Sequence, residues 1–302
     1  MMSHVDKRSE KSNPQLPGQK FGRRAGVAAM GVFTMIVATG CSLAEWQRGA
    51  MPEPVTEQAP ATLSFWTGSW IALLIVGVFV WGLMFWAFIA YRRRSHSDVP
   101  VQTRYNMPIE ALWTVAPLIL VVGIFYFAAR DEAEITRVSN DQTQTVNVVG
   151  FRWSWTFNYV EENVYDTGQP AYRPDSPQGS ARQLVPPEEN SAAPVLWLPI
   201  NEKVQFQLTS PDVIHSFWVP NFLYKLDVIP GRTNVFEVTP NKLGTYAGRC
   251  AELCGVDHSR MLFSLKVVTQ QEFDAHVADL RARGQEGQLD TGRTTNNAQS
   301  VG

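Results

Sequence analysis

The sequence predicts a membrane-anchored all-β protein, in which a two-helix transmembrane hairpin is followed by a β-sandwich or β-barrel domain. Two nearly uninterrupted apolar runs, 63–91 and 109–130, are each long enough to cross a bilayer. From Gln144 onward the pattern changes to short β-branched and aromatic runs separated by turn residues, which is typical of an all-β domain. The formal net charge of −2 argues against nucleic acid as a partner.

Residues 1–40 have the features of a secretory signal peptide: a basic start, a short apolar run and small residues before Cys41. The apolar run is too short to span a bilayer. Ala-Thr-Gly-Cys41 resembles a bacterial lipobox, although Ala38 stands where Leu is usual. We expect cleavage before Cys41 and lipidation of its thiol. Ordinary cleavage nearby and an uncleaved anchor are the alternatives.

Residues 41–62 contain Pro and Glu without periodicity and are predicted to form an external tether. The first apolar run ends at Arg92-Arg93-Arg94, which the positive-inside rule keeps in the cytoplasm. The second run therefore returns to the outer side, where it ends at Arg130. This orientation agrees with an exported N-terminus. We expect a plasma-membrane protein with two spanning helices and its β domain on the outer face.

The β domain is predicted to cover 131–270, with a polar insertion at 160–193. Six acids and two arginines give this insertion a net charge of −4. It is either a solvated loop or an acidic docking surface for a basic partner. Residues 271–302 are expected to form a helix and a polar tail, and His276 on that helix and His96 in the cytoplasmic loop to be ordinary surface histidines.

One short stretch carries the chemistry: Cys250-Ala-Glu-Leu-Cys254-Gly-Val-Asp-His258-Ser-Arg-Met261. Soft sulfur ligands favour copper, and imidazole suits copper or zinc. With His215 upstream, the chain has the single-copper set of one Cys, two His and a Met, plus a second Cys. Both thiolates could therefore bridge two coppers, each capped by a histidine. Zinc and a structural disulfide are the alternatives.

In the binuclear arrangement, Cys250 and Cys254 span both metals, and His215 and His258 bind one copper each. The thioether of Met261 would be the weak ligand of one metal, and the backbone carbonyl of Glu252 that of the other. An electron spread over two metals and two sulfurs changes each bond length little. Such a centre suits one-electron transfer.

Cys-x-Glu-x-Cys-Gly-x-x-His-x-x-Met, preceded by Asp-Val-x-His-Ser, resembles the CuA domain of subunit II of haem–copper cytochrome c oxidases, and the resemblance extends over about residues 63–270. It implies a cupredoxin-like Greek-key barrel and the electron-input subunit of a bacterial aa3-type oxidase. Electrons would pass from a c-type cytochrome to copper and then to haem in subunit I, where O2 reduction drives proton translocation. The implied partners are subunits I and III and the cytochrome. With the lipobox and the insertion, the donor could be the cytochrome c domain of a bcc complex in a supercomplex.

The resemblance also implies roles for single residues. Trp153, in an aromatic Gly-x-x-Trp-x-Trp segment, would be the electron entry, although Ser154 replaces the usual middle ring. Glu110 would lie at the mouth of the proton path called the K-channel; as an alternative, it is an acid favoured at a helix N-terminus. The carboxylate of Glu252 would bind Mg2+ at the boundary with subunit I.

Three further residues are assigned in the same way. Asp212 and Asp227 would form hydrogen bonds that orient the copper ligands. Arg232 would be a polar link to the catalytic subunit or, alternatively, an ordinary surface arginine.

Three other classes of protein were weighed. The CuA domain of a nitrous oxide reductase would need a large His-rich domain, and this chain has five histidines. A quinol oxidase subunit II would lack the copper ligands. A lipid-anchored copper carrier would expose one labile copper and would need no two-helix anchor.

Overall fold

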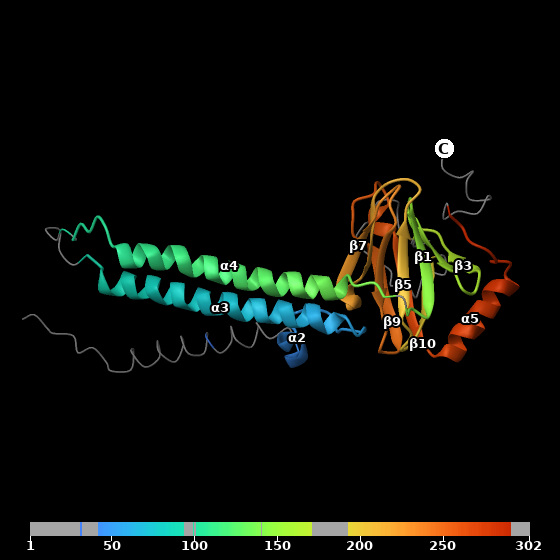
Figure 1. Ribbon diagram of the computed structural model, residues 1–302, viewed down its shortest axis with the longest axis horizontal. Coiled ribbons are helices and arrows are strands. Elements are labelled where there is room, and N and C mark those ends of the chain that lie inside the picture. The colour runs from blue at the N-terminus through green and yellow to red at the C-terminus, as the bar shows by residue number, and fades with distance from the viewer. Residues whose placement is uncertain are drawn as a thin grey trace, which may run out of the picture. The chain divides into compact units, whose positions relative to one another are not determined.

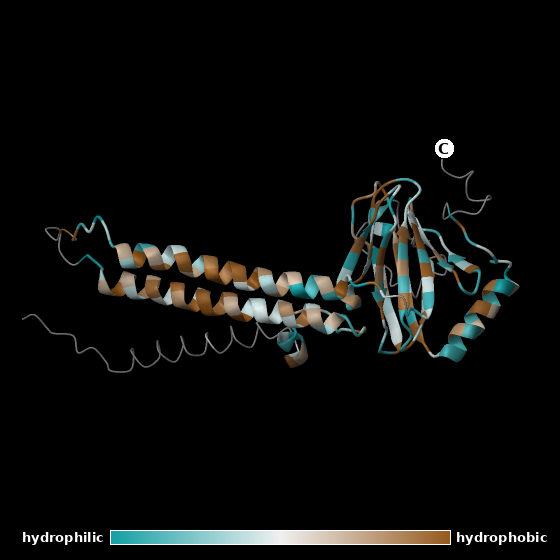
Figure 2. Ribbon diagram, in the orientation of Figure 1, coloured by the Kyte–Doolittle hydropathy of each residue, from teal (hydrophilic) through white to brown (hydrophobic). Residues whose placement is uncertain are grey.

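A computed structural model describes residues 42–93, 101–139, 141–170 and 193–290, together with Gly31 and Val99. Two long helices, α3 (Ala59–Ala90) and α4 (Met107–Ile135), pack side by side as a hairpin (Figure 1). Both are long and apolar enough to cross a membrane, and apolar residues dominate their surfaces (Figure 2). These side chains are largely exposed, as expected of helices whose solvent is lipid.

Both helices extend beyond the predicted spans 63–91 and 109–130. α3 begins at Ala59, with Pro60 in its first turn, where a missing N–H breaks no helical hydrogen bond. α4 continues through charged residues to Ile135. The end of an apolar run marks the membrane boundary, whereas charged residues with good helix propensity extend the helix beyond it.

Two five-stranded sheets form a β-sandwich (Figure 1). In sheet order, the first contains β3 (Val164–Thr167), β2 (Ser154–Tyr159), β1 (Gln144–Phe151), β5 (Val204–Thr209) and β8 (Asn234–Val238). The second contains β4 (Val195–Pro199), β10 (Leu262–Val268), β9 (Gly244–Cys250), β6 (His215–Val219) and β7 (Tyr224–Val228). The pairs β1–β5 and β4–β10 are parallel, and the other pairs are antiparallel. Between the two strands of each parallel pair, the chain passes through the other sheet. This architecture confirms the predicted cupredoxin-like all-β fold.

Buried aromatic rings from both sheets meet in the core. Phe217 on β6 stacks on Phe263 on β10, with ring centroids 5.0 Å apart, and lies 5.5 Å from Phe206 on β5. Trp155 on β2 meets Phe217 and Phe263 edge-on, and its ring also lies 6.2 Å from that of His215. Burying each large apolar side chain contributes about 1.5–3 kcal/mol. This cluster of aromatic rings therefore adjoins a predicted metal ligand.

The segment 53–58, which the sequence assigned to an external tether at 41–62, packs against the β domain. Val55 is buried. Its N–H donates to the carbonyl of Asn221 at 3.2 Å, and its carbonyl accepts from the N–H of Asn241 at 2.9 Å. Asn221 lies in the short 3-10 helix η2 (Pro220–Phe222) and Asn241 in a loop, so neither belongs to a strand ladder and the segment has no alternating pattern. The chain that enters α3 is thus fixed to the β domain.

The predicted insertion at 160–193 contains a strand, because β3 lies inside it and pairs with β2. Four residues in a polar context give too short a pattern to recognise. Residues 171–192 lie outside the described part of the chain. Docking of a partner on the insertion therefore stays a prediction. The terminal helix α5 (Gln270–Ala282) begins with a capping box between Thr269 and Glu272 and packs against β3 and β4. A further short helix, α2 (Leu43–Gln47), lies in the N-terminal unit.

The prediction that His276 is a surface histidine is wrong, because its side chain is buried. Its ring stacks on Trp197, with centroids 4.4 Å apart, and its Nε2 lies 3.7 Å from Oδ2 of Asp166. Burial lowers the pKa of His276 to about 4. The other predicted surface histidine, His96, lies outside the described residues.

Candidate metal centre

The predicted ligands come from two loops at one end of the sandwich. His215 is the first residue of β6, and Cys250 is the last residue of β9. β6 and β9 are neighbours, since Phe217 pairs with Cys250. The other ligands lie on the loop that joins β9 to β10, which contains the short 3-10 helix η3 (His258–Arg260). We call residues 250–261 the ligand loop.

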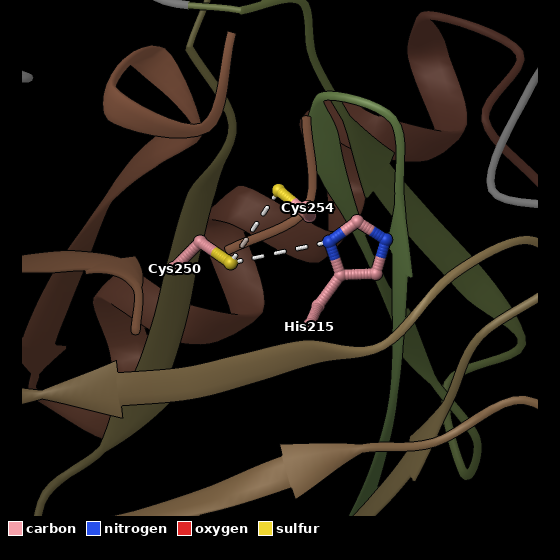
Figure 3. A group of neighbouring side chains, drawn as sticks. All are labelled: His215, Cys250 and Cys254. Atoms are coloured by element: carbon pink, nitrogen blue, oxygen red, sulfur yellow. Dashed lines mark hydrogen bonds between the residues drawn. The ribbon is translucent and has the colours of Figure 1, made fainter. Parts of the chain in front are cut away.

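The side chains of His215, Cys250 and Cys254 point toward one another (Figure 3). The two Sγ atoms are 3.8 Å apart, and Nδ1 of His215 is 3.9 Å from Sγ of Cys250. Nδ1 of His258 lies 3.5 Å and Sδ of Met261 3.7 Å from Sγ of Cys254. The carbonyl oxygen of Glu252 lies 3.2 Å from Sγ of Cys250. The other four predicted ligand atoms therefore lie within 4 Å of one of the two cysteine sulfurs.

The two cysteines do not form the disulfide that was considered as an alternative. Both are free and buried, and a disulfide requires about 2.05 Å between the sulfurs. The hydrogen bond with Cys254 is the main reason that the pKa of Cys250 is lowered, and the same contact raises the pKa of Cys254. Metal binding would remove the second proton, because the thiolate is the ligand form.

The chemistry of this donor set fits copper. Thiolates and a thioether are soft ligands, and imidazole suits copper as well. A structural zinc site could use two cysteines and two histidines, but it gives no role to the thioether of Met261 or to the carbonyl of Glu252 beside the sulfurs. The full set of six atoms is what a two-copper centre would use.

A carboxylate fixes the orientation of His215. Nε2 of this fully buried imidazole lies 2.9 Å from Oδ1 of Asp212, which leaves Nδ1 facing the sulfurs. Burial alone would lower the pKa of His215, but the hydrogen bonds to Asp212 and Cys250 outweigh it and raise that pKa. Asp212 accepts backbone N–H groups from Arg152 at 2.8 Å and Val213 at 2.7 Å. Despite partial burial, these hydrogen bonds and that of His215 keep the pKa of Asp212 well below its usual range.

Backbone hydrogen bonds fix the other histidine. His258 N–H donates to the carbonyl of Gly255 at 3.2 Å, and Met261 N–H donates to the carbonyl of His258 at 3.2 Å. Cys250 N–H donates to the carbonyl of Met261 at 3.0 Å, which closes the base of the ligand loop. The buried indole of Trp155 donates to that same carbonyl at 3.4 Å. The loop is thus tied both to itself and to the core.

Trp153 contacts the ligand loop directly. Its indole Nε1 donates to the carbonyl of Cys254 at 3.1 Å. The ring lies against Gly255, where a Cβ would come within 3.0 Å of Nε1. Gly255 also has φ +122°, a conformation that favours glycine. The half-buried tryptophan predicted as the electron entry is therefore one hydrogen bond away from a candidate ligand.

The other predicted residues lie apart from the cluster. The carboxylate of Glu252 is exposed, and only the carbonyl of this residue faces the sulfurs. Asp227 is exposed on β7, and its backbone carbonyl accepts a hydrogen bond from the side-chain amide of Asn234 at 2.7 Å. Arg232 is also exposed. Within the described residues, no hydrogen bond joins the carboxylate of Asp227 to a ligand, so its predicted orienting role gains no support.

Two further predictions fall elsewhere in the chain. Glu110 lies in the first turn of α4, where its carboxylate accepts the N–H of Asn106 at 2.9 Å. This position in the first turn fits the alternative to proton entry, an acid favoured at a helix N-terminus. Cys41, the predicted lipidation site, lies outside the described residues.

The sequence did not reveal the parts played by Arg152 and Trp155. Arg152 holds Asp212 through its backbone N–H and through an ion pair with 3.4 Å between Nε and Oδ2. Trp155 holds the carbonyl of Met261. Both residues lie beside Trp153 in the Gly-x-x-Trp-x-Trp segment, so proximity to a recognised motif was the signal that could have found them.

Comparisons with known proteins agree with this arrangement. A family model for the periplasmic domain of cytochrome c oxidase subunit II matches residues 144–268, and a model for its transmembrane domain matches residues 45–129. The chain is 46% identical over 315 residues to a probable cytochrome c oxidase subunit 2 of Streptomyces avermitilis, with 94% of this chain and 95% of the relative covered. It is 33% identical over 294 residues to cytochrome c oxidase subunit 2 of Mycobacterium tuberculosis, with 84% and 81% covered.

One solved structure with a likeness is the periplasmic domain of subunit II of cytochrome oxidase of Bradyrhizobium japonicum. It is 26% identical and has a TM-score of 0.39. The alignment covers 48% of this chain and 99% of that structure.

Proposed function

Because the chain belongs to the cytochrome c oxidase subunit II family, we propose that it accepts electrons from a c-type cytochrome at a binuclear copper centre. It then passes them to haem in subunit I, where O2 is reduced and protons are translocated. The observation that carries this proposal is the convergence of four candidate ligand atoms on the two buried cysteine sulfurs, which makes a set of six.

Each part of the cluster has a distinct task. When bound, the copper pair supplies a one-electron carrier whose charge is shared with the two sulfurs. Cys250 and Cys254 would hold both metals, and His215 and His258 would hold one each. Met261 and the carbonyl of Glu252 would complete the set. Asp212 accepts a hydrogen bond from Nε2–H of His215 and so keeps Nδ1 available, which is the usual role of a carboxylate behind a metal-bound imidazole.

Electrons would enter through Trp153. The candidate ligands Cys250, Cys254, Met261 and His215 are buried, so a donor protein cannot touch them. The half-buried Trp153 joins the surface to the carbonyl of Cys254. An electron placed on or near this ring is one hydrogen bond from the copper ligands. The rigid sandwich holds both loops in place, so little structural rearrangement accompanies the transfer.

The remaining roles concern the membrane and the complex. We place the β domain on the outer face of the plasma membrane, and a lipid on Cys41 would add a second anchor beside α3 and α4. The exposed carboxylate of Glu252 would bind Mg2+ at the boundary with subunit I, where Arg232 would add a polar link. Glu110 would lie at a proton entry. Subunits I and III would complete the enzyme, with the cytochrome c domain of a bcc complex as a candidate donor.

Purification of the intact complex through a tag on this chain tests the proposal. We expect haem a and the catalytic subunit to co-purify, and reduced c-type cytochrome to support O2 consumption. A chain that purifies alone with one labile copper would instead be a copper carrier. A complex that oxidises quinol but not cytochrome c would also contradict the proposal.

A further inference from the structure

The two helices of the hairpin pack side by side but leave a cleft between them (Figure 1). Its volume is about 540 Å³, within the range of roughly 300–1,000 Å³ that is typical of small-molecule sites. Residues of α3 line it from Ser64 to Ala72, and residues of α4 line it from Ile119 to Asp131. Most of these side chains are apolar. The cleft therefore offers an apolar ligand a space within a single chain.

Two glycines keep the cleft open. Gly68 on α3 and Gly123 on α4 both line it. Apart from the neighbouring backbone of its own helix, no atom lies within 4 Å of the place where a Cβ would stand at either position. Glycine weakens a helix relative to alanine, so backbone stability does not favour these residues. Larger side chains at these two positions would extend into the cleft and close it.

An ion pair lies at the Asp131 end of the cleft. Oδ1 of the buried Asp131 accepts from Nε of Arg130 at 2.9 Å and from Nη2 at 2.7 Å. The guanidinium lies over the ring of Phe127, with Cζ 5.2 Å from the centroid. The Arg130 side chain is nevertheless 58% exposed, and among the described residues no acceptor binds its Nη1. This nitrogen can donate to a further anion, and a guanidinium suits phosphate in particular.

The length of the cleft matches one leaflet of a bilayer. At 1.5 Å per residue, the lining segment of α4 from Ile119 to Asp131 is about 18 Å long, and that of α3 from Ser64 to Ala72 is about 12 Å long. The hydrocarbon core of a bilayer is about 30 Å thick, so one leaflet contributes about 15 Å. Arg130 ends the apolar run of α4. The cleft thus extends from the headgroup level to about the middle of the membrane.

A single hydrocarbon chain fits this space better than a helix of a neighbouring subunit. A helix with its side chains is about 10–12 Å wide, so an 18 Å segment occupies at least about 1,400 Å³. The cleft holds less than half of that volume. An empty apolar cleft would lack van der Waals contacts along both helices. A flexible acyl chain can supply these contacts over the whole length of the cleft.

We propose that the cleft binds one acyl chain of an outer-leaflet phospholipid, and that Arg130 binds the phosphate of the same lipid. Such a lipid has both an apolar chain and an anion, which is the combination that the cleft and its charged end recognise. The inference rests on the proposed orientation of the hairpin and is independent of the copper centre. The bound lipid would pack α3 against α4 in the outer half of the membrane.

Photolabelling of the intact oxidase complex tests the proposal. The complex is placed in phosphatidylcholine vesicles that contain a trace of phosphatidylglycerol with a photoreactive group on one acyl chain. We expect mass spectrometry to find the label on residues 64–72 and 119–131. Gly68→Leu combined with Gly123→Leu should reduce this labelling at least about fivefold, because the new side chains fill the space.

Gly82→Leu is the matched control for the cleft. Gly82 also lies on α3 with open space around its Cβ position, but it does not line the cleft. Labelling in this variant should stay within about twofold of the unchanged chain, as for other substitutions away from a site.

A second comparison tests the contact with the headgroup. Arg130→Gln combined with Asp131→Asn removes both charges, so that no buried carboxylate is left unpaired. Labelling by the phospholipid, relative to a diacylglycerol with the same photoreactive chain, should fall about threefold or more when the guanidinium is lost. Arg130→Lys keeps the positive charge and should keep most of the preference for the phospholipid.

Equal labelling in the double-leucine variant and in Gly82→Leu would overturn the proposal, since the label would then come from lipid that only surrounds the helices. An unlabelled cleft in the unchanged complex would also overturn it. If, in addition, the double-leucine variant loses subunit I, a side chain of that subunit occupies the cleft instead. Where the double-leucine variant does not assemble, the phospholipid preference of the Arg130 variants decides. Copper content and cytochrome oxidation are measured in the same samples, and only their absence in the unchanged chain would contradict the proposed function.

Discussion

The two histidines of the centre are held in different ways. His215 is fully buried at the start of a strand, and Asp212, three residues earlier, fixes its ring, with the backbone N–H groups of Arg152 and Val213 behind it. His258 is half-buried in a short 3-10 helix, and its position depends on backbone hydrogen bonds within the ligand loop. One ligand thus depends on a carboxylate side chain that the distant Arg152 also holds, and the other on the backbone conformation of the ligand loop. The first should respond to substitution of its partners, and the second to changes in the backbone.

The largest effect on copper content and on cytochrome oxidation should come from a ligand that lies near several of the others. Cys254→Ser removes a thiolate that lies within 4 Å of Cys250, His258 and Met261. We expect loss of at least one copper per chain and a fall in cytochrome oxidation of more than about 100-fold, above the range for an outer hydrogen-bonding partner. Metal analysis and steady-state kinetics measure both. Ser259→Ala, on an exposed position of the same loop, is the control. Full copper content in Cys254→Ser would show that this thiolate does not bridge.

The next substitutions compare the two histidines directly. Asp212→Asn removes the charge behind His215 and should weaken copper binding about 10–100-fold. Asp257→Asn breaks the ion pair with Arg260 beside His258 and should change copper affinity less than about threefold, because partly exposed ion pairs contribute little. Competition with a copper chelator measures both constants. Equal losses of copper affinity in the two variants would refute the contrast between His215 and His258.

A change in the backbone of the ligand loop should affect the surroundings of His258 more than those of His215. In Gly255→Ala, φ +122° and the contact with Trp153 at 3.0 Å both oppose the new Cβ. We expect a loss of about 1–3 kcal/mol in stability and about tenfold slower electron entry, as the indole is displaced. Gly287→Ala is the control, because this glycine has φ +93° and open space around the Cβ position. Thermal unfolding and stopped-flow reduction measure the two effects. If Gly255→Ala slows entry no more than Gly287→Ala does, the tryptophan contact has no role in it.

The smallest effect on the copper centre is expected from substitutions in the transmembrane hairpin. Glu110→Gln keeps an acceptor for the N–H of Asn106 but cannot carry a proton. We expect unchanged copper content and unchanged reduction of copper by the donor, with slower turnover and proton uptake. Glu110→Ala should behave similarly and should also destabilise α4 by about 1 kcal/mol through loss of the cap. Normal proton uptake in Glu110→Gln would leave this residue as a helix cap alone.

The sequence was sufficient where the physical cause is local. Apolar length predicts the hairpin, and the chemistry of closely spaced Cys, His and Met residues predicts the cluster. It was insufficient at the ends of helices, since hydropathy marks where lipid ends and not where α4 ends at Ile135. The burial of Val55 could not be predicted either, because its partners Asn221 and Asn241 lie more than 150 residues further along the chain.

His276 is a different case, because the signal was present. Phe273, His276, Val277 and Leu280 have the i, i+3, i+4, i+7 spacing of a buried helix face, and all four are buried. Treating the histidine by residue type rather than by position led to the wrong prediction. For Asp212 the reverse holds: a motif indicated the right residue, but its contacts with Arg152 and Val213 are visible only in the folded chain.

The central claim is that two thiolates and two histidines hold two coppers that share one electron. Metal analysis combined with electron paramagnetic resonance of the purified oxidase tests it most directly. We predict two coppers assigned to this chain and a mixed-valence signal whose unpaired electron couples equally to both. A single-copper signal, or zinc in place of copper, would contradict the account and would leave the second cysteine without its proposed role.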